Sequence, residues 1–226
     1  MNRQYRQQRP MMIALGGLSG TGKSSVGHAL SLIIEDAVFL DSDVLRKKLH
    51  GVSPTTPLPD DAYTPEKQRT FKTHVRNAAH AELENYKIVV VTGTFLDEGS
   101  RKEQEAFAHS CGANFIGIFM KAPMKTVYDR VAGREGKTAS DADIRIVDRQ
   151  KTARTTPEKN SSWTVIDANQ PFEKVVTDTV HAIDTAAKSM SRLTAAKNQS
   201  SASTAKNPSS ASTAQGKRKK SQFQPK

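Results

Sequence analysis

The sequence has a single cysteine, Cys111, among its 226 residues. One cysteine excludes an intrachain disulfide and any metal site built from several cysteines. Long apolar runs are also missing. The run MMIAL near the N-terminus is too short for the apolar part of a signal peptide, or for a membrane span of about 20 residues. These absences predict a protein of the reducing cytoplasm with no part inside a membrane.

Acidic residues are absent from the C-terminal part of the chain. Residues 188–226 contain nine Lys and Arg and no Asp or Glu, and residues 1–10 contain three Arg. Of 34 Lys and Arg in all, 22 therefore remain in 11–187, against 23 Asp and Glu, which gives a net charge of −1 there. The total charge of +11 therefore belongs to the two ends, and the near-neutral middle argues against an electrostatic groove for nucleic acid.

Composition divides the chain into a polar arm at 1–10, a domain at 11–187 and a low-complexity tail at 188–226. The tail repeats SSASTAKN as SSASTAQG and then reads GKRKK. A segment of this kind buries too little apolar surface to offset its ordering entropy, so we expect it to be disordered. We interpret it as a solubilising tail, and a weak contact with nucleic acid is the alternative.

Between the two ends, short apolar runs alternate with segments of helical periodicity. The runs have the length of buried parallel strands, and they are Met12–Gly16, Ala37–Asp41, Ile88–Thr92, Phe115–Met120 and Trp163–Asp167. The expected helices are Gly22–Ile34, Pro65–Tyr86, Glu98–Ser110, Met124–Arg134, Asp141–Ala153 and Phe172–Ala187. This alternation predicts an α/β fold with a five-stranded parallel sheet and helices on both faces.

Residues 17–24 read GLSGTGKS and fit the phosphate-binding pattern G-x-x-x-x-G-K-[ST] at every fixed position. An expected strand precedes them and an amphipathic helix follows. In such a loop, backbone N–H groups and the helix N-terminus bind phosphate oxygens, Lys23 reaches the β- and γ-phosphates, and Ser24 offers its hydroxyl to Mg²⁺. The predicted nucleotide-binding residues are Gly17, Leu18, Ser19, Gly20, Thr21, Gly22, Lys23, Ser24 and Ser25.

Two aspartates, Asp41 and Asp43, lie at the end of the second expected strand. Ligands gather at the carboxyl ends of parallel strands, so both side chains should lie beside the phosphate loop. A carboxylate there could take the proton of an acceptor hydroxyl or hold Mg²⁺ through water, and Arg46 could bind an anionic acceptor. The alternative, given equal weight, is a helix start with Asp41 or Ser42 as N-cap and Arg46 on the surface.

The segments GGLSGTGKSS, LDSDVLRKKLHG, TFL at 94–96 and ASDAD at 139–143 occur in this order. With them, residues 11–170 resemble the P-loop kinases grouped as AAA family ATPases, which are similar to the ATP-binding half of bifunctional aminoglycoside-phosphotransferase-like proteins. Gluconate kinase, zeta-toxin kinase and adenylate kinase are wider relatives. The resemblance implies the P-loop NTPase fold of the nucleoside-monophosphate-kinase type and ATP as phosphate donor. It also implies Asp43 as base and Arg46 as acceptor ligand. Asp41, from its place at the end of the second expected strand, is with Ser24 the candidate to hold Mg²⁺.

The third expected strand departs from that family. The family commonly reads VVVDATF, whereas residues 89–95 read VVVTGTF, so that Thr92 stands where Asp is usual. A carboxylate there would support Mg²⁺, and a hydroxyl is a weaker, neutral ligand. Either Asp41 or Asp43 compensates, or Mg²⁺ affinity and turnover are reduced.

Residues 128–136 read YDRVAGREG and are similar to the D-R-x-x-G-R stretch at the lid entrance of adenylate kinases. That resemblance implies that Arg130 stacks on adenine, that Arg134 reaches the phosphates, and that a mobile lid follows. Arg145 and Arg149 share one face of the next expected helix. We expect Arg145 on the surface, and leave Arg149 open between the surface and the closed site.

The sequence therefore predicts a cytoplasmic kinase that uses ATP and Mg²⁺ to phosphorylate a hydroxyl group of a small molecule. The basic ends slightly favour a second possibility, a kinase acting on a polynucleotide or another macromolecule. Thr92 favours a third, an ATP-binding regulator with little turnover. No pattern in the sequence identifies the acceptor or the oligomeric state.

Overall fold

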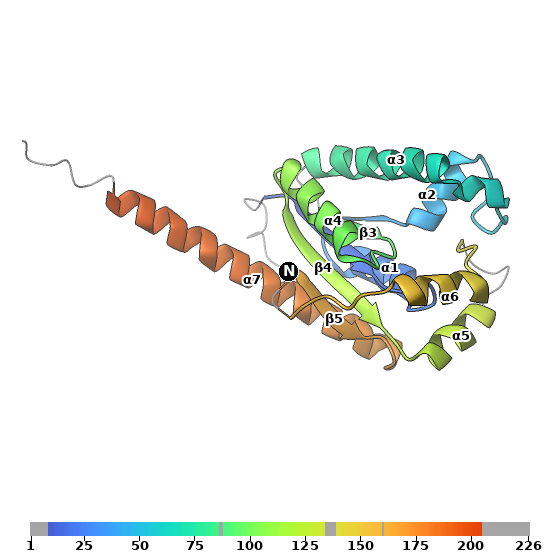
Figure 1. Ribbon diagram of the computed structural model, residues 1–226. Coiled ribbons are helices and arrows are strands. Elements are labelled where there is room, and N and C mark those ends of the chain that lie inside the picture. The colour runs from blue at the N-terminus through green and yellow to red at the C-terminus, as the bar shows by residue number, and fades with distance from the viewer. Residues whose placement is uncertain (1–8, 86–87, 134–138, 160, 205–226) are drawn as a thin grey trace, which may run out of the picture. The chain divides into compact units, whose positions relative to one another are not determined.

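The computed structural model describes residues 9–85, 88–133, 139–159 and 161–204, with side chains up to residue 196. Five parallel strands form one sheet in the order β2-β3-β1-β4-β5 (Figure 1). They are β1 (Met11–Gly16), β2 (Ala37–Leu40), β3 (Ile88–Thr92), β4 (Asn114–Lys121) and β5 (Trp163–Asp167). The five-stranded parallel sheet expected from the apolar runs is confirmed.

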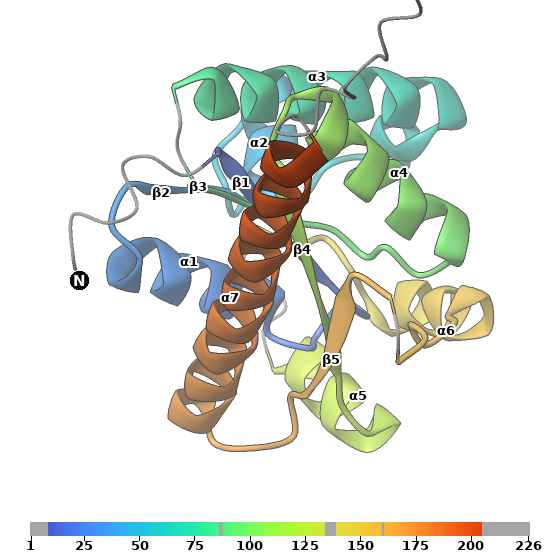
Figure 2. The ribbon, with the colours of Figure 1, turned by 90° about the vertical axis from the view of Figure 1, so that its left-hand side faces the viewer.

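Helices cover both faces of this sheet, with α3 and α4 on one face and α1 and the first part of α7 on the other (Figures 1 and 2). The helices are α1 (Lys23–Ile33), α2 (Ser42–Leu49), η2 (Asp60–Tyr63), α3 (Pro65–Glu84), α4 (Glu98–Ser110), α5 (Met124–Ala132), α6 (Ile144–Ala153) and α7 (Phe172–Thr204). The strands run toward α2, α5 and α6, so these helices surround the carboxyl edge of the sheet, where ligands bind in such folds (Figure 1).

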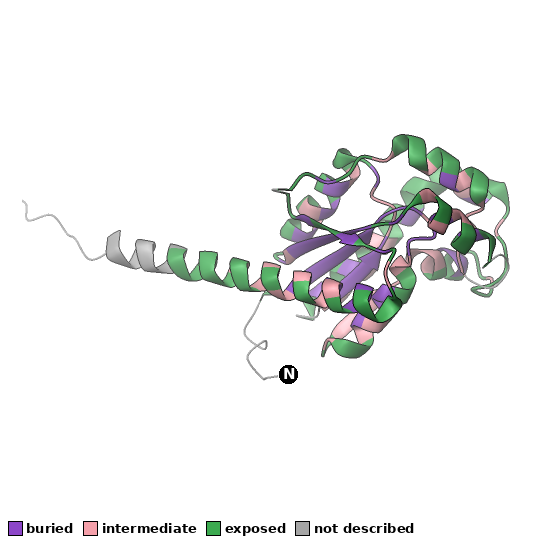
Figure 3. Cartoon of the chain, turned by 90° about the horizontal axis from the view of Figure 1, so that it is seen from below, coloured by how far each residue is buried: buried purple, intermediate pink, exposed green. Residues whose placement is uncertain are grey.

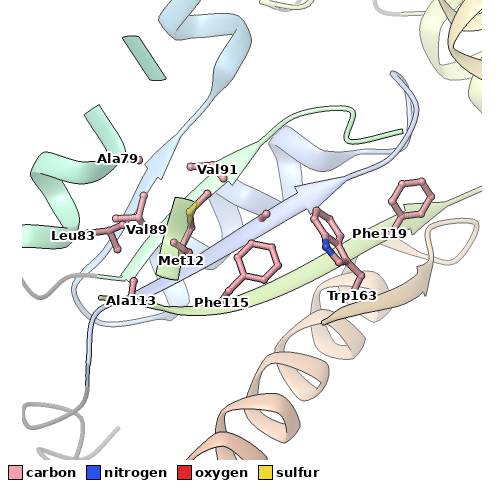
Figure 4. Packing of buried hydrophobic residues seen from close by; sticks show 11 residues of the cluster. Met12, Ala79, Leu83, Val89, Val91, Ala113, Phe115, Phe119 and Trp163 are labelled. Atoms are coloured by element: carbon pink, nitrogen blue, oxygen red, sulfur yellow. The ribbon is translucent and has the colours of Figure 1, made fainter. Parts of the chain in front are cut away.

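The central strands β1 and β4 are buried from both sides, which explains their continuous apolar sequence (Figure 3). On one face, Met12 and Ala14 pack with Leu83 of α3 and Ala108 of α4 (Figure 4). Trp163 lies against β4 so closely that a Cβ atom on Gly117 would be 2.2 Å from its ring. This core fixes the ends of β1 and β4, from which the phosphate loop and the segment before α5 continue.

The C-terminal segment differs from its prediction. The chain divides into two compact units, Met1–Ala187 and Lys188–Lys226, and disorder was expected throughout the second. Instead, α7 continues to Thr204. The expectation was wrong for 188–204 because Ala, Lys, Arg, Met and Leu favour a helix even where little surface is buried. Residues 205–226, with the GKRKK run, lie outside the described residues.

Within the described ranges, no helix is both long and apolar enough to cross a membrane.

The helix that was expected over 141–153 begins later, at Ile144, because the Asp143 carboxylate accepts the N–H of Ile146 at 2.9 Å and thereby caps α6. The residues just before it are consequently outside the helix, where Asp141 is able to bind other parts of the domain.

Candidate active site

The phosphate-loop sequence forms a tight turn between β1 and α1. Gly17, with φ of 130°, lies so close to the end of β4 that a Cβ atom there would be 2.3 Å from the Met120 carbonyl oxygen. Its N–H donates to the Thr94 carbonyl at 2.9 Å. Gly22 is the N-cap of α1, and no side chain in the described part of the chain caps that helix. This geometry fits a phosphate group as the capping ligand.

Lys23, Ser24 and Ser25 occupy the first turn of α1. The Lys23 ammonium group lies over the loop, and its Nζ donates to the carbonyls of Gly17 at 3.0 Å and Leu18 at 2.8 Å. Ser24 and Ser25 are exposed. An ammonium group held beside the loop, with two serine hydroxyl groups at the helix start, is a donor set suited to a nucleoside triphosphate.

The middle of the loop packs against α5. A Cβ atom on Gly20 would lie 2.9 Å from Val131, so this position has no room for a side chain. Thr21 is buried, and its hydroxyl donates to the Leu18 carbonyl at 2.8 Å. Leu18 itself is buried in the core. The loop is thus shaped by its own bonds and by α5 before any ligand is considered.

One contact to the loop could not be expected from the motif. Gln150 of α6 accepts the Ser19 N–H at 2.9 Å and donates to the Ser19 hydroxyl at 3.1 Å. Arg149, which was left open as a site residue, is exposed. The two residues differ because of the side of α6 on which they lie. Val147 is buried, and Gln150 lies one turn further along on the same side of the helix, whereas Arg149 does not.

Asp41 and Ser42 begin α2, as in the helix-start alternative. The Asp41 carboxylate accepts the N–H groups of Asp43 at 2.9 Å and Val44 at 3.4 Å, and Thr92 Oγ1 accepts the Ser42 N–H at 3.2 Å. This start of α2 is therefore fixed both by its own cap and by the end of β3.

Asp41 also lines a pocket of about 390 Å³ together with Ser24 of the phosphate loop. A hydroxyl and a carboxylate are oxygen donors suited to Mg²⁺, which keeps several waters and binds substrate phosphates. Over the described ranges, no group of three His, Cys, Asp or Glu could hold a metal by itself. The two residues fit a metal that arrives with a nucleotide.

Arg46 is not on the surface, which corrects that part of the helix-start alternative. It is 8% exposed, and its guanidinium carbon lies 3.8 Å from the Phe71 ring centre and 5.0 Å from that of Tyr63. Its Nη2 donates to Gln68 Oε1 at 2.8 Å. Burial lowers the pKa of Arg46, while Tyr63 and Asp43 act in the opposite direction. An arginine remains charged under such conditions, so a positioned cation lies one turn after Asp43.

The next residue of α2, Lys47, is the centre of a buried polar network. Its side chain is 1% exposed and forms an ion pair with Asp141, and it also donates to the Thr56 carbonyl. The Asp141 carboxylate accepts the Tyr63 hydroxyl and, at 3.3 Å, the Leu58 N–H. Burial, followed by the bond to Asp141, raises the pKa of Tyr63. The ASDAD segment thus fastens residues 56–63 and α2 to the start of α6.

The lid residues are only partly described. Arg130 Nη1 donates to the Ala168 carbonyl at 3.0 Å, which places it beside the loop that follows β5. Arg145 pairs with Asp143 and is 87% exposed, which agrees with the surface position expected for it. The bond from the Ile146 N–H, followed by Arg145, lowers the pKa of Asp143. Arg134 lies outside the described residues.

The strand order, the glycine loop at the end of β1 and the capped α2 beside it define a protein of the P-loop kinase class. A family model described as an AAA domain matches residues 12–157. The chain belongs to this AAA domain family, and the resemblance drawn from its motifs is confirmed.

Curated relatives and solved structures agree with that assignment. The chain is 32% identical over 130 residues to an adenylyl-sulfate kinase of Paraburkholderia xenovorans, over 55% of this chain and 65% of that protein. It is 31% identical over 140 residues to a probable adenylyl-sulfate kinase of Synechocystis, over 59% and 72%. It thus spans just under two thirds of the first relative. A gluconokinase from Sinorhizobium meliloti has a similar fold, with a TM-score of 0.58 and 22% identity over 83% of this chain and 99% of that one.

The buried ion pair leads to a stability prediction. Asp141→Ala should lower the free energy of unfolding by about 3 kcal/mol, because the Lys47 ammonium group would stay buried without its carboxylate. Combining it with Lys47→Met removes the buried charge and should recover most of that loss. Urea unfolding followed by far-UV circular dichroism measures both variants.

Asp61→Ala is the matched control, since this carboxylate pairs with Lys67 in an exposed position and its loss should leave the unfolding midpoint nearly unchanged. Two results would contradict the role given to the pair. One is an Asp141→Ala variant as stable to urea as the wild type, and the other is a double variant less stable than Asp141→Ala alone.

Proposed function

We propose that the protein is a cytoplasmic kinase that transfers the γ-phosphoryl group of ATP to a hydroxyl group of a small molecule. The observation that carries this proposal is the position of α2. Its N-cap, Asp41, lines the same pocket as Ser24 of the phosphate loop, and Asp43 and Arg46 follow on the same helix. The helix that carries the proposed acceptor ligands therefore begins beside the phosphate loop, which supports the proposal. The names of the relatives, adenylyl-sulfate kinase and gluconokinase, support a small acceptor.

Each residue has a role that follows from its chemistry. The loop N–H groups and Lys23 would bind the phosphate oxygens and offset their charge. Asp43 would accept the proton of the acceptor hydroxyl as that oxygen bonds to the γ-phosphorus and the bond from phosphorus to the β–γ bridging oxygen breaks. Arg46, oriented by Phe71 and Gln68, would bind an anionic group of the acceptor.

The lid arginines extend this arrangement to the nucleotide. Arg130, beside the loop after β5, would contact adenine, and Arg134 would reach the phosphates, as their likeness to the adenylate kinase lid implies. A planar guanidinium suits both tasks, since it stacks on aromatic rings and binds phosphate oxygens in pairs. These roles complete a site in which positive charge surrounds the transferred group.

The proposed kinase would also require Mg²⁺. Ser24 and Asp41 would hold it, and when bound it would offset charge on the phosphates. Thr92 is a specific reason to keep a second possibility, an ATP-binding regulator with little turnover. Its side chain is buried and neutral, at a position where a carboxylate would support the metal.

The first test follows the label from γ-labelled ATP, with Mg²⁺ and a small-molecule cell extract, by chromatography. A new labelled compound should form with the wild-type chain. It should form at least about 100-fold more slowly with Lys23→Ala, because a main source of positive charge at the phosphates is lost. Label that appears only as free phosphate, or does not move, would favour the regulator.

Asp43→Asn tests the proposed base. With the labelled acceptor from the first experiment, kcat should fall about 100-fold or more, because an amide cannot take the hydroxyl proton. The affinity for ATP should change little, since Asp43 is assigned to the acceptor. Asp61→Asn, at an exposed position of η2, is the control and should retain wild-type kcat. Full activity of Asp43→Asn would remove Asp43 from the mechanism.

Thr92→Asp tests the metal proposal. Thr92 accepts the Ser42 N–H, and an Asp oxygen can accept the same bond, so α2 should keep its place. The added carboxylate should lower the Mg²⁺ concentration that gives half-maximal activity by several-fold. Thr92→Asn has the same shape without the charge and should not lower it. Equal Mg²⁺ requirements in all three proteins would mean that position 92 does not support the metal.

A further inference from the structure

A contact across 131 positions of sequence joins the phosphate loop to α6. Gln150 Oε1 accepts the backbone N–H of Ser19 at 2.9 Å, and Gln150 Nε2 donates to Ser19 Oγ at 3.1 Å. The backbone N–H can only donate, so the orientation of the amide is determined: its oxygen faces the peptide and its nitrogen faces the hydroxyl. Two bonds from one planar group fix both the main chain and the side chain of a single loop residue.

Ser19 occupies the part of the loop that most needs such a restraint. It lies between Gly17 and Gly20, both of which have positive φ, and glycines lose the most conformational entropy when a loop becomes ordered. Side chains within the loop, those of Thr21 and Lys23, donate to the Leu18 carbonyl, and Lys23 donates to the Gly17 carbonyl as well. The bond to Gln150 holds the other side of this same Leu18–Ser19 peptide, its N–H, from outside the loop.

The helix that carries Gln150 is itself firmly placed. Just before its start, Asp141 is bound to Lys47 and Tyr63 in the buried network beside the proposed acceptor residues. Along its length, Val147 is buried and Tyr128 of α5 donates to Asp148. An anchored helix therefore presents the amide, so the restraint on Ser19 is transmitted from the rest of the domain.

We infer that Gln150 is a positioning residue that keeps the phosphate loop in the shape that binds nucleotide. The inference rests on the proposed function for the nature of the ligand. Because the amide is neutral, Gln150 orders the loop without placing a charge against the triphosphate. The contact orders the loop before the nucleotide binds, so less conformational entropy is lost on binding. It should therefore increase nucleotide affinity, and it takes no part in the chemical step.

The test is the dissociation constant of ATP, measured by titration calorimetry on the full chain. Gln150→Ala should weaken binding about tenfold, since two hydrogen bonds that order the loop are lost. Ser19→Ala should weaken it about threefold, because it removes only the hydroxyl contact. The double variant should match Gln150→Ala alone, as expected when two side chains act through one contact. Lys151→Ala, next to it on the exposed side of α6, is the control and should bind ATP like the wild type.

A purely structural role would give a different result. Gln150→Ala would then lower the unfolding midpoint of the nucleotide-free protein and leave the ATP dissociation constant unchanged, and that outcome would overturn the inference. Additive effects of Ser19→Ala and Gln150→Ala would overturn it as well. A wild-type chain that does not bind ATP would instead refute the proposed function, and the inference with it. The two failures are therefore distinguishable.

Discussion

The close approach of Gly17 to the end of β4 is the constraint on which the nucleotide site depends. A Cβ atom at this position would lie 2.3 Å from the Met120 carbonyl oxygen, and one on Gly20 would lie 2.9 Å from Val131. The loop can therefore pass between β4 and α5 only as bare backbone. That passage sets where α1 begins, and with it the direction of the N–H groups that a phosphate would meet. The chemistry of Lys23 is useful only because this backbone path exists.

On the side proposed for the acceptor, α2 carries a buried cation, the Lys47 ammonium group. Lys47 and Asp141 lose hydration when they pair, so the pair adds little net stability compared with apolar side chains. It does connect α2 to the segment before α6, because the Asp141 carboxylate is shared by the Lys47 ammonium group and the Tyr63 hydroxyl. Arg46, adjacent in sequence, is thereby held against Phe71. Fixed geometry, not stability, is the contribution that suits a binding site.

The sheet and the phosphate loop could be predicted because their signals are local. A run of apolar residues identifies a buried strand, and fixed glycines with Lys23 identify the loop. The Lys47–Asp141 pair could not be predicted, since charged residues are usually exposed and the partners are 94 positions apart. Gln150 was missed because the charge of Arg149 suggested a phosphate ligand, although the phase set by a buried Val147 already favoured Gln150.

Thr92 shows how fold and activity can separate at one residue. Its hydroxyl accepts the Ser42 N–H, which is the structural task that an aspartate oxygen could perform equally well. The start of α2 should therefore keep its place beside the phosphate loop with either residue at position 92. What should change is the charge available to a metal, because with Thr92 the one acidic side chain among the described residues that line the pocket with Ser24 is Asp41. An active kinase and an ATP-binding regulator would consequently share this geometry, and electrostatics at the carboxyl end of β3 would decide between them.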